Sequence, residues 1–170
     1  LVYPWMKSHH LGDINILVSF ALLPALGTFF VAVGAYDPQS LLMILPIGLL
    51  TVSILHANNT RDVKTDLQAG LGTITTSVSL MNAKAIYTFE IFAPYALALL
   101  YVVLLGQPWT LLAVVLTLPL ALRNVRTMIQ AEDDLPYRGI QRLDQTTAQL
   151  QMAFGLLYAL GFFLGSWLGV

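Results

Sequence analysis

The sequence predicts an all-α integral membrane protein with about five transmembrane helices. Of its 170 residues, 57% are hydrophobic and only 10% are charged, whereas soluble domains carry roughly 25% charged residues. The shortage is concentrated in long stretches without a single Asp, Glu, Lys or Arg, and these are residues 14–36, 38–60, 91–122 and 145–170. Because about 20 apolar residues suffice for a helix to cross a bilayer, each stretch is long enough to span one.

Turn signals divide the chain into the expected spans. Asp37-Pro38 separates the first two, and Gly106-Gln107-Pro108 divides the longest uncharged stretch between two helices. The five helices are expected at about residues 13–36, 39–57, 83–105, 109–128 and 147–167. The polar stretches between the second and third spans and between the fourth and fifth spans are expected to be loops.

With these five spans, all basic residues are expected on one side of the membrane. The basic residues precede the first span or lie in and beside the two polar stretches, and they are Lys7, Arg61, Lys64, Lys84, Arg123, Arg126, Arg138 and Arg142. With five spans, these three regions share one side of the membrane, which the positive-inside rule makes the cytoplasmic side. We therefore expect a lipid bilayer as the partner and polar loops that face the cytoplasm.

Composition excludes several other classes. The chain has no cysteine, so disulfides and cysteine-ligated metal sites are excluded. Its formal net charge is −1, so it offers no basic surface for nucleic acid, and we expect no nucleic-acid partner.

The polar stretch after the second span carries the candidate chemistry, in a loop expected from His56 to Asp66. Asn58, Asp62 and Asp66 are four residues apart, a spacing that places them on one face where the chain is helical. Two carboxylates one turn apart repel each other unless a cation lies between them, and Mg²⁺ suits one or two carboxylates with phosphate oxygens and water.

Two basic residues are interleaved with these carboxylates. Arg61 and Lys64 would lie on neighbouring faces, so the segment predicts a site for a polyanion bridged by metal, such as a diphosphate. The alternative is that the Asp and Asn side chains cap the helix or face water, with Arg61 and Asp66 forming a surface ion pair.

The longer string is more specific. Asn-Asn-x-Arg-Asp-x-x-x-Asp-x-x-x-Gly at residues 58–70 resembles the second aspartate-rich motif of the UbiA superfamily of intramembrane prenyltransferases. It looks like the menaquinone-synthesis branch, the 1,4-dihydroxy-2-naphthoate prenyltransferases (MenA type) and their animal relatives. Further segments resemble this branch in the same order, and they are His9–Asp13, Phe92–Tyr95, Leu143–Leu150 and Gly155–Leu157.

The resemblance covers the whole chain but only part of the family's architecture. Members have a nine-helix bundle with two aspartate-rich motifs, and this chain resembles the last five helices. The family's first motif, Asn-x-x-x-Asp-x-x-x-Asp, has no counterpart here. Because the first residue is Leu1, we expect a piece of a longer protein whose missing N-terminal helices carry that motif, and we expect the piece alone to be inactive.

The resemblance implies transfer of a polyprenyl group from an isoprenyl diphosphate to an aromatic acceptor, 1,4-dihydroxy-2-naphthoate, in menaquinone synthesis at a bacterial plasma membrane. Mg²⁺ is the implied cofactor. The implied site residues are Asp62 and Asp66 as catalytic metal ligands, Asn58 and Asn59 as groups that orient them or the diphosphate, and Arg61 and Lys64 as groups that neutralise the diphosphate.

Several alternatives stay open. The chain could be a membrane transporter, although its polar residues cluster at one face rather than at the midplane, or a non-catalytic or half-enzyme subunit that requires a partner chain. His56 could serve near the aromatic substrate or only pack. Glu90 could be functional, reach the interface or pair with Lys84. Arg138 and Arg142 could cover the diphosphate or belong to a solvated face.

Overall fold

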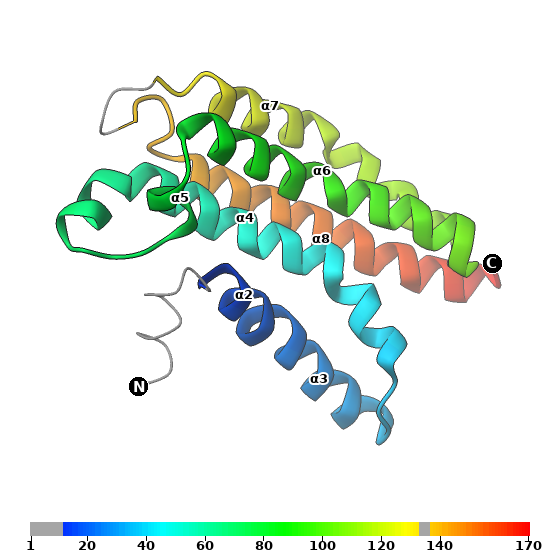
Figure 1. Ribbon diagram of the computed structural model, residues 1–170. Coiled ribbons are helices and arrows are strands. Elements are labelled where there is room, and N and C mark those ends of the chain that lie inside the picture. Colours follow the sequence, from blue (N-terminus) through cyan, green and yellow to red (C-terminus); the bar gives the residue numbers. More distant parts are fainter. Residues whose placement is uncertain (1–11, 133–136) are drawn as a thin grey trace.

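The described residues of the computed structural model, 12–132 and 137–170, form a helical membrane bundle without a β-strand (Figure 1). The elements are α2 (Gly12–Leu17), the π-helical turn η1 (Val18–Leu22), α3 (Leu23–Val33), α4 (Pro38–Gln68), the short α5 (Ile74–Ser77), α6 (Leu80–Leu105), the 3₁₀ helix η2 (Trp109–Thr117), α7 (Leu118–Ile129) and α8 (Leu143–Leu168). Five helical spans are long and apolar enough to cross a membrane. The predicted all-α membrane class is therefore confirmed.

Helix α4 extends 11 residues beyond its expected end at residue 57. The polar segment 58–68 contains neither Gly nor Pro, so nothing interrupts the backbone hydrogen bonds. The helix ends before Gly70, whose φ of 66° suits glycine. The expected loop from His56 to Asp66 is therefore wrong, because polar side chains at the end of this span do not interrupt the helix. At about 46 Å, a 31-residue helix crosses an apolar core of about 30 Å and extends roughly 15 Å past it.

Two spans change their helical type beside a proline. The first span contains the π-helical turn η1 immediately before Leu23-Pro24, and the fourth changes from 3₁₀ to α-helix at Leu118-Pro119. Proline has no N–H to donate, so it cannot continue the ordinary backbone hydrogen bonding across that turn. The fourth span, expected as one helix, is therefore two joined segments.

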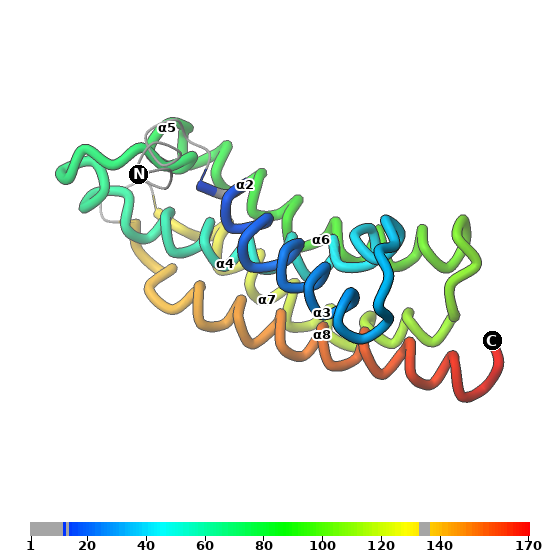
Figure 2. The backbone as a smooth tube through the Cα atoms, turned by 90° about the horizontal axis from the view of Figure 1, so that it is seen from below, coloured from blue at the N-terminus to red at the C-terminus, as the bar shows by residue number. Residues whose placement is uncertain are grey.

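Helices α4, α6 and α8 form the centre of the bundle, and η2 and α7 cover α6 and α8. The first span lies along the outside of α4, as Figures 1 and 2 show from two directions. Only 6% of the most apolar part of the first span is buried, against 39% for α4. The first span is therefore peripheral in this chain.

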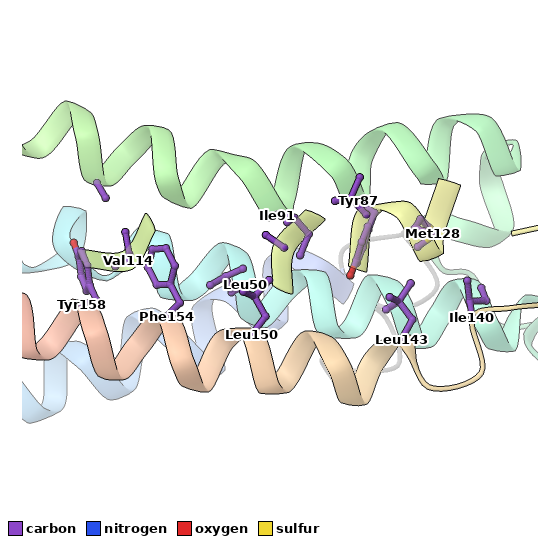
Figure 3. Close-up of a cluster of buried hydrophobic side chains, with 14 of the residues drawn as sticks. Leu50, Tyr87, Ile91, Val114, Met128, Ile140, Leu143, Leu150, Phe154 and Tyr158 are labelled. Carbon is purple, nitrogen blue, oxygen red and sulfur yellow. The ribbon is translucent and has the colours of Figure 1, made fainter. Parts of the chain in front are cut away.

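Aromatic and aliphatic side chains fill the space between α6 and α8 (Figure 3). Phe154 packs edge-on against the ring of Tyr95, with the ring centroids 5.2 Å apart. The Tyr87 hydroxyl hydrogen-bonds the Thr147 hydroxyl at 2.7 Å, and the Tyr158 hydroxyl donates to the Met43 carbonyl at 3.0 Å. These bonds link helices inside the bundle while satisfying the polar ends of buried tyrosines.

One end of the bundle is polar. The C-terminal part of α4, α5, the start of α6, the end of α7 and the start of α8 lie together there, and the turn after Leu105 lies at the opposite end (Figure 1). Lys84 stabilises this end, because its ammonium group donates to the carbonyls of Ile129 and Ala131 at 2.8 and 2.7 Å. A cation near these carbonyls complements the C-terminus of α7. Which side of a membrane this end faces stays a prediction.

Glycine allows η2 to approach α8 closely. Thr110 Oγ1 donates to the Gly161 carbonyl at 2.5 Å. A Cβ atom at Gly161 would lie 2.9 Å from the Leu111 Cα and the Thr110 carbonyl oxygen, which belong to the backbone and cannot move aside cheaply. At Gly155, on the same helix, a Cβ would lie 3.6 Å from the side chain of Ile47, which is an ordinary contact.

This difference predicts the effect of two matched substitutions. Gly161→Ala should destabilise the protein by about 1–3 kcal/mol, because the added methyl group pushes η2 off α8. Gly155→Ala should be neutral or stabilise by up to about 1 kcal/mol, because alanine favours the helix. Thermal unfolding of both variants in detergent measures the effect, and equal unfolding temperatures would contradict the close packing.

Candidate functional site

The candidate motif occupies the last three turns of α4, at the polar end of the bundle. Its two buried residues, Thr60 and Val63, face the other helices. Asn58, Asp62 and Asp66 follow one another at single-turn intervals and are half-buried. The helix therefore places these three oxygen-bearing side chains in a row where the apolar bundle meets the polar region.

Arg61 connects this row to another helix. Its Nε and Nη2 donate to the two carboxylate oxygens of Asp62 at 2.8 and 2.9 Å, and its Nη1 donates to Asp144 Oδ2 at 2.7 Å. Nη2 also donates to Asn58 Oδ1. Asp144 lies in the first turn of α8. The guanidinium group thus binds two carboxylates and one amide, and it joins the end of α4 to the start of α8.

The carboxylates of the motif fit a hard divalent cation. Asp62 and Asp66 lie one turn apart, and the side chain of Asp62 is 39% exposed. Each carboxylate oxygen keeps a second lone pair when it accepts one hydrogen bond. Within the described part of the chain, no group of three or more His, Cys, Asp or Glu side chains could enclose a metal. Two carboxylates completed by water and phosphate oxygens suit Mg²⁺ rather than Zn²⁺.

The other predicted site residues are placed as follows. Asn59 is half-buried and Lys64 is exposed on the last turns of α4. Arg61 is less available to a diphosphate than the sequence implied, because several N–H donors of its guanidinium group already bind the carboxylates of Asp62 and Asp144. Arg138 and Arg142 are exposed, and Arg142 directly precedes α8. Residues 9–11 of the N-terminal segment lie outside the described residues.

His56 and Glu90 form a buried pair between α4 and α6. His56 Nδ1 lies 3.5 Å from Glu90 Oε1, and the two side chains are 0% and 7% exposed. The Tyr87 ring lies beside the imidazole, with the ring centroids 6.2 Å apart. Glu90 does not reach the interface, and the ammonium group of Lys84 binds the carbonyls of Ile129 and Ala131 instead. Among the open alternatives, the geometry favours packing for His56 and contradicts a Glu90–Lys84 pair.

Sequence reasoning gave Asp144 no role. Its side chain is 20% exposed, and its Oδ1 is buried with no hydrogen-bond partner in the described structure. A signal was present, because Asp144 is the last charged residue before the uncharged stretch 145–170. No sequence rule connects it to Arg61, which is 83 positions away.

An apolar groove lies between α4 and α6 in the membrane-spanning part of the bundle. Its volume is about 430 Å³, and its lining residues are Leu49, Phe89, Phe92, Ala93, Ala96 and Leu97. Two of them belong to the Phe92–Tyr95 segment. With no charged side chain in its lining, the groove suits a hydrocarbon chain rather than a polar ligand.

Known proteins are similar to most of this chain. Residues 1–138 match the family model described as the UbiA prenyltransferase family. UbiA prenyltransferase domain-containing protein 1 of Gallus gallus is 32% identical over 158 residues, which cover 91% of this chain and 44% of that protein. The Xenopus tropicalis protein of the same name is 34% identical over 158 residues, covering 91% and 42%. The Homo sapiens protein is 31% identical over 155 residues, covering 91% and 43%.

The chain spans less than half of the length of these relatives. The family match nevertheless includes all of α4, with its row of carboxylate and amide side chains, and also the first span and α6, which pack against α4. Helix α8 lies beyond the matched residues. Since the family model covers more than half of the chain, this membrane protein belongs to the UbiA prenyltransferase family.

Proposed function

We propose that this chain contributes one half of the active site of a Mg²⁺-dependent prenyltransferase. The reaction transfers a polyprenyl group from an isoprenyl diphosphate to an aromatic acceptor, 1,4-dihydroxy-2-naphthoate, in menaquinone synthesis. The observation that carries the proposal is the pair Asp62 and Asp66, on successive turns of α4 where that helix leaves the apolar bundle. Family membership supports prenyl transfer, and the naphthoate acceptor rests on resemblance alone.

Different residues of the motif are assigned to bind Mg²⁺ and the diphosphate. Asp62 and Asp66 hold Mg²⁺, which neutralises the diphosphate as its charge develops on bond breaking. Asn58 and Asn59 orient these carboxylates or the diphosphate. Lys64, which is exposed, reaches the diphosphate directly, and Arg61 adds positive charge from its position between Asp62 and Asp144. The first aspartate-rich motif is proposed to lie outside this chain.

The location at a membrane follows from the substrate. A polyprenyl tail is apolar, and the groove between α4 and α6 provides an apolar surface along the bundle while the diphosphate stays at the polar end. In the transfer step, the allylic carbon–oxygen bond of the diphosphate breaks and a bond forms to the naphthoate ring. A π-electron pair of the ring forms the new carbon–carbon bond, the ring carboxylate leaves as CO₂, and the electron pair of the broken ring–carboxylate bond restores the aromatic ring.

The metal-binding assignment predicts the effect of removing each carboxylate. In the complete protein that contains this chain, Asp62→Asn and Asp66→Asn should each lower Mg²⁺-dependent transfer by roughly 100-fold or more, because the leaving diphosphate loses its counter-charge. Product formation with a labelled prenyl diphosphate measures this.

Asp37→Asn is the matched acidic control. Asp37 caps the opposite end of α4, accepting from the backbone N–H of Gln39 at 2.9 Å. Because asparagine caps a helix about as well as aspartate, Asp37→Asn should leave transfer within about twofold and change stability little. Undiminished transfer by both motif variants would refute the site. Movement of prenyl diphosphate across liposomes without transfer would favour a transporter instead.

The acceptor assignment has a separate prediction. With dihydroxynaphthoate labelled in its carboxyl group, each prenyl transfer should release one molecule of labelled CO₂. A product that retains the label would reject this step. Transfer to other aromatic rings but not to dihydroxynaphthoate would reject the acceptor while leaving prenyl transfer intact.

A further inference from the structure

We infer that Asp144 is a positioning residue for the metal site: from the first turn of α8 it anchors Arg61, so that Asp62 can bind a divalent cation while the guanidinium group stays in place. This inference rests on the proposed function. Asp144 lies outside the aspartate-rich motif, on a different helix and 82 positions after Asp62.

The contacts show a guanidinium group shared between two helices. Arg61 Nη1 donates to Asp144 Oδ2 at 2.7 Å, while Nε and Nη2 bind the two oxygens of Asp62. Arg61 and Asp62 are neighbours on α4, but Asp144 approaches from α8. The position of Arg61 therefore depends on the packing of α8 against α4 as well as on its own helix.

The ion pair between Arg61 and Asp144 is partly buried, so each side chain would be costly to leave without the other. The side chains of Arg61 and Asp144 are 28% and 20% exposed, and Asp144 Oδ1 is buried with no hydrogen-bond partner in the described structure. Arg61 donates a hydrogen bond to the other oxygen of this carboxylate, Oδ2. A partly buried charge whose partner is removed is costly, so Arg61 and Asp144 are expected to stay together when Asp62 changes its partner.

Arg61 and the proposed divalent cation compete for the carboxylate oxygens of Asp62. Both of its oxygens accept hydrogen bonds from Arg61, so a divalent cation must share these oxygens or displace the guanidinium group. Asp144 gives Arg61 a second anionic partner and thereby lowers the cost of releasing Asp62. Without the Asp144 charge, Asp62 would be the main anionic partner of Arg61 and would bind the cation less tightly.

The test measures cation binding directly, apart from activity. The complete protein in lipid nanodiscs is titrated with Mn²⁺, and the free ion is followed by electron paramagnetic resonance. Asp144→Asn should raise the Kd for Mn²⁺ by about tenfold or more, which is the typical effect of removing a partner that orients a metal ligand. Asp144→Glu, which keeps the charge, should recover most of the affinity, and the Mg²⁺ concentration needed for half-maximal transfer should follow the same order.

A stability control separates positioning from simple helix packing. Thr147 lies one turn further along α8 and hydrogen-bonds Tyr87 inside the bundle. Thr147→Val should lower the unfolding temperature but leave the Kd for Mn²⁺ unchanged. If Asp144→Asn behaves like Thr147→Val, with lower stability and unchanged Mn²⁺ affinity, the inference is overturned.

A second variant keeps the test decisive where Asp144→Asn fails to fold. Arg61→Lys retains the charge but lacks the fork that binds Asp62 and Asp144 together, so it should also raise the Kd for Mn²⁺. Wild-type affinity in folded Arg61→Lys overturns the inference. Asp62→Asn tests the proposed metal site separately from the role of Asp144: if it leaves both Mn²⁺ binding and transfer unchanged, the proposed metal site itself fails.

Discussion

The continuity of α4 is the constraint on which the rest of the structure depends. A helix in lipid must satisfy its own backbone hydrogen bonds, and polar side chains are tolerated where it leaves the apolar core. With 31 residues, α4 spans that core and still carries Asn58, Asp62 and Asp66 on ordered turns beyond it. Had the chain become irregular after residue 57, these side chains would have lost their common face.

Contacts with neighbouring helices hold α4 at two positions along its length. Within the apolar region, the buried His56–Glu90 pair joins α4 to α6, and aromatic side chains fill the space beside α8. At the polar end, Arg61 and Asp144 join α4 to α8. Rotation of α4 about its axis would disturb both contacts. The row of carboxylates is therefore held in orientation by partners that do not belong to the motif.

Composition and periodicity predicted the five spans because the cost of placing charges in lipid leaves a strong signal in the sequence. They failed at residues 58–68, where polarity suggested a loop although the i, i+4 spacing of the same residues was already helical. They located the fourth span, which the structure has at Trp109–Ile129, but they did not predict its change from 3₁₀ to α-helix, because that change depends on local hydrogen bonding near Pro119.

The candidate site was predictable in its local part only. Spacing along one helix identified Asp62 and Asp66, and resemblance gave them their expected roles. The contact between Arg61 and Asp144 joins residues 83 positions apart, and its formation depends on how α8 packs against α4. The sequence could not predict the partners of Lys84 either, because they are backbone carbonyls at the end of α7, and every residue type has such a carbonyl.

Charge balance explains why the proposed site needs its metal. Asp62, Asp66 and Asp144 contribute three negative charges, and Arg61 and Lys64 contribute two positive ones, so the five side chains sum to −1. A diphosphate approaching them would meet a slightly repulsive cluster, because Asp62 and Asp144 already offset the charge of Arg61. Adding one divalent cation changes the sum to +1 and reverses the interaction. Under the proposed function, the carboxylates that surround Arg61 thus make anion binding depend on metal, and a bare diphosphate would gain little from the two basic residues alone.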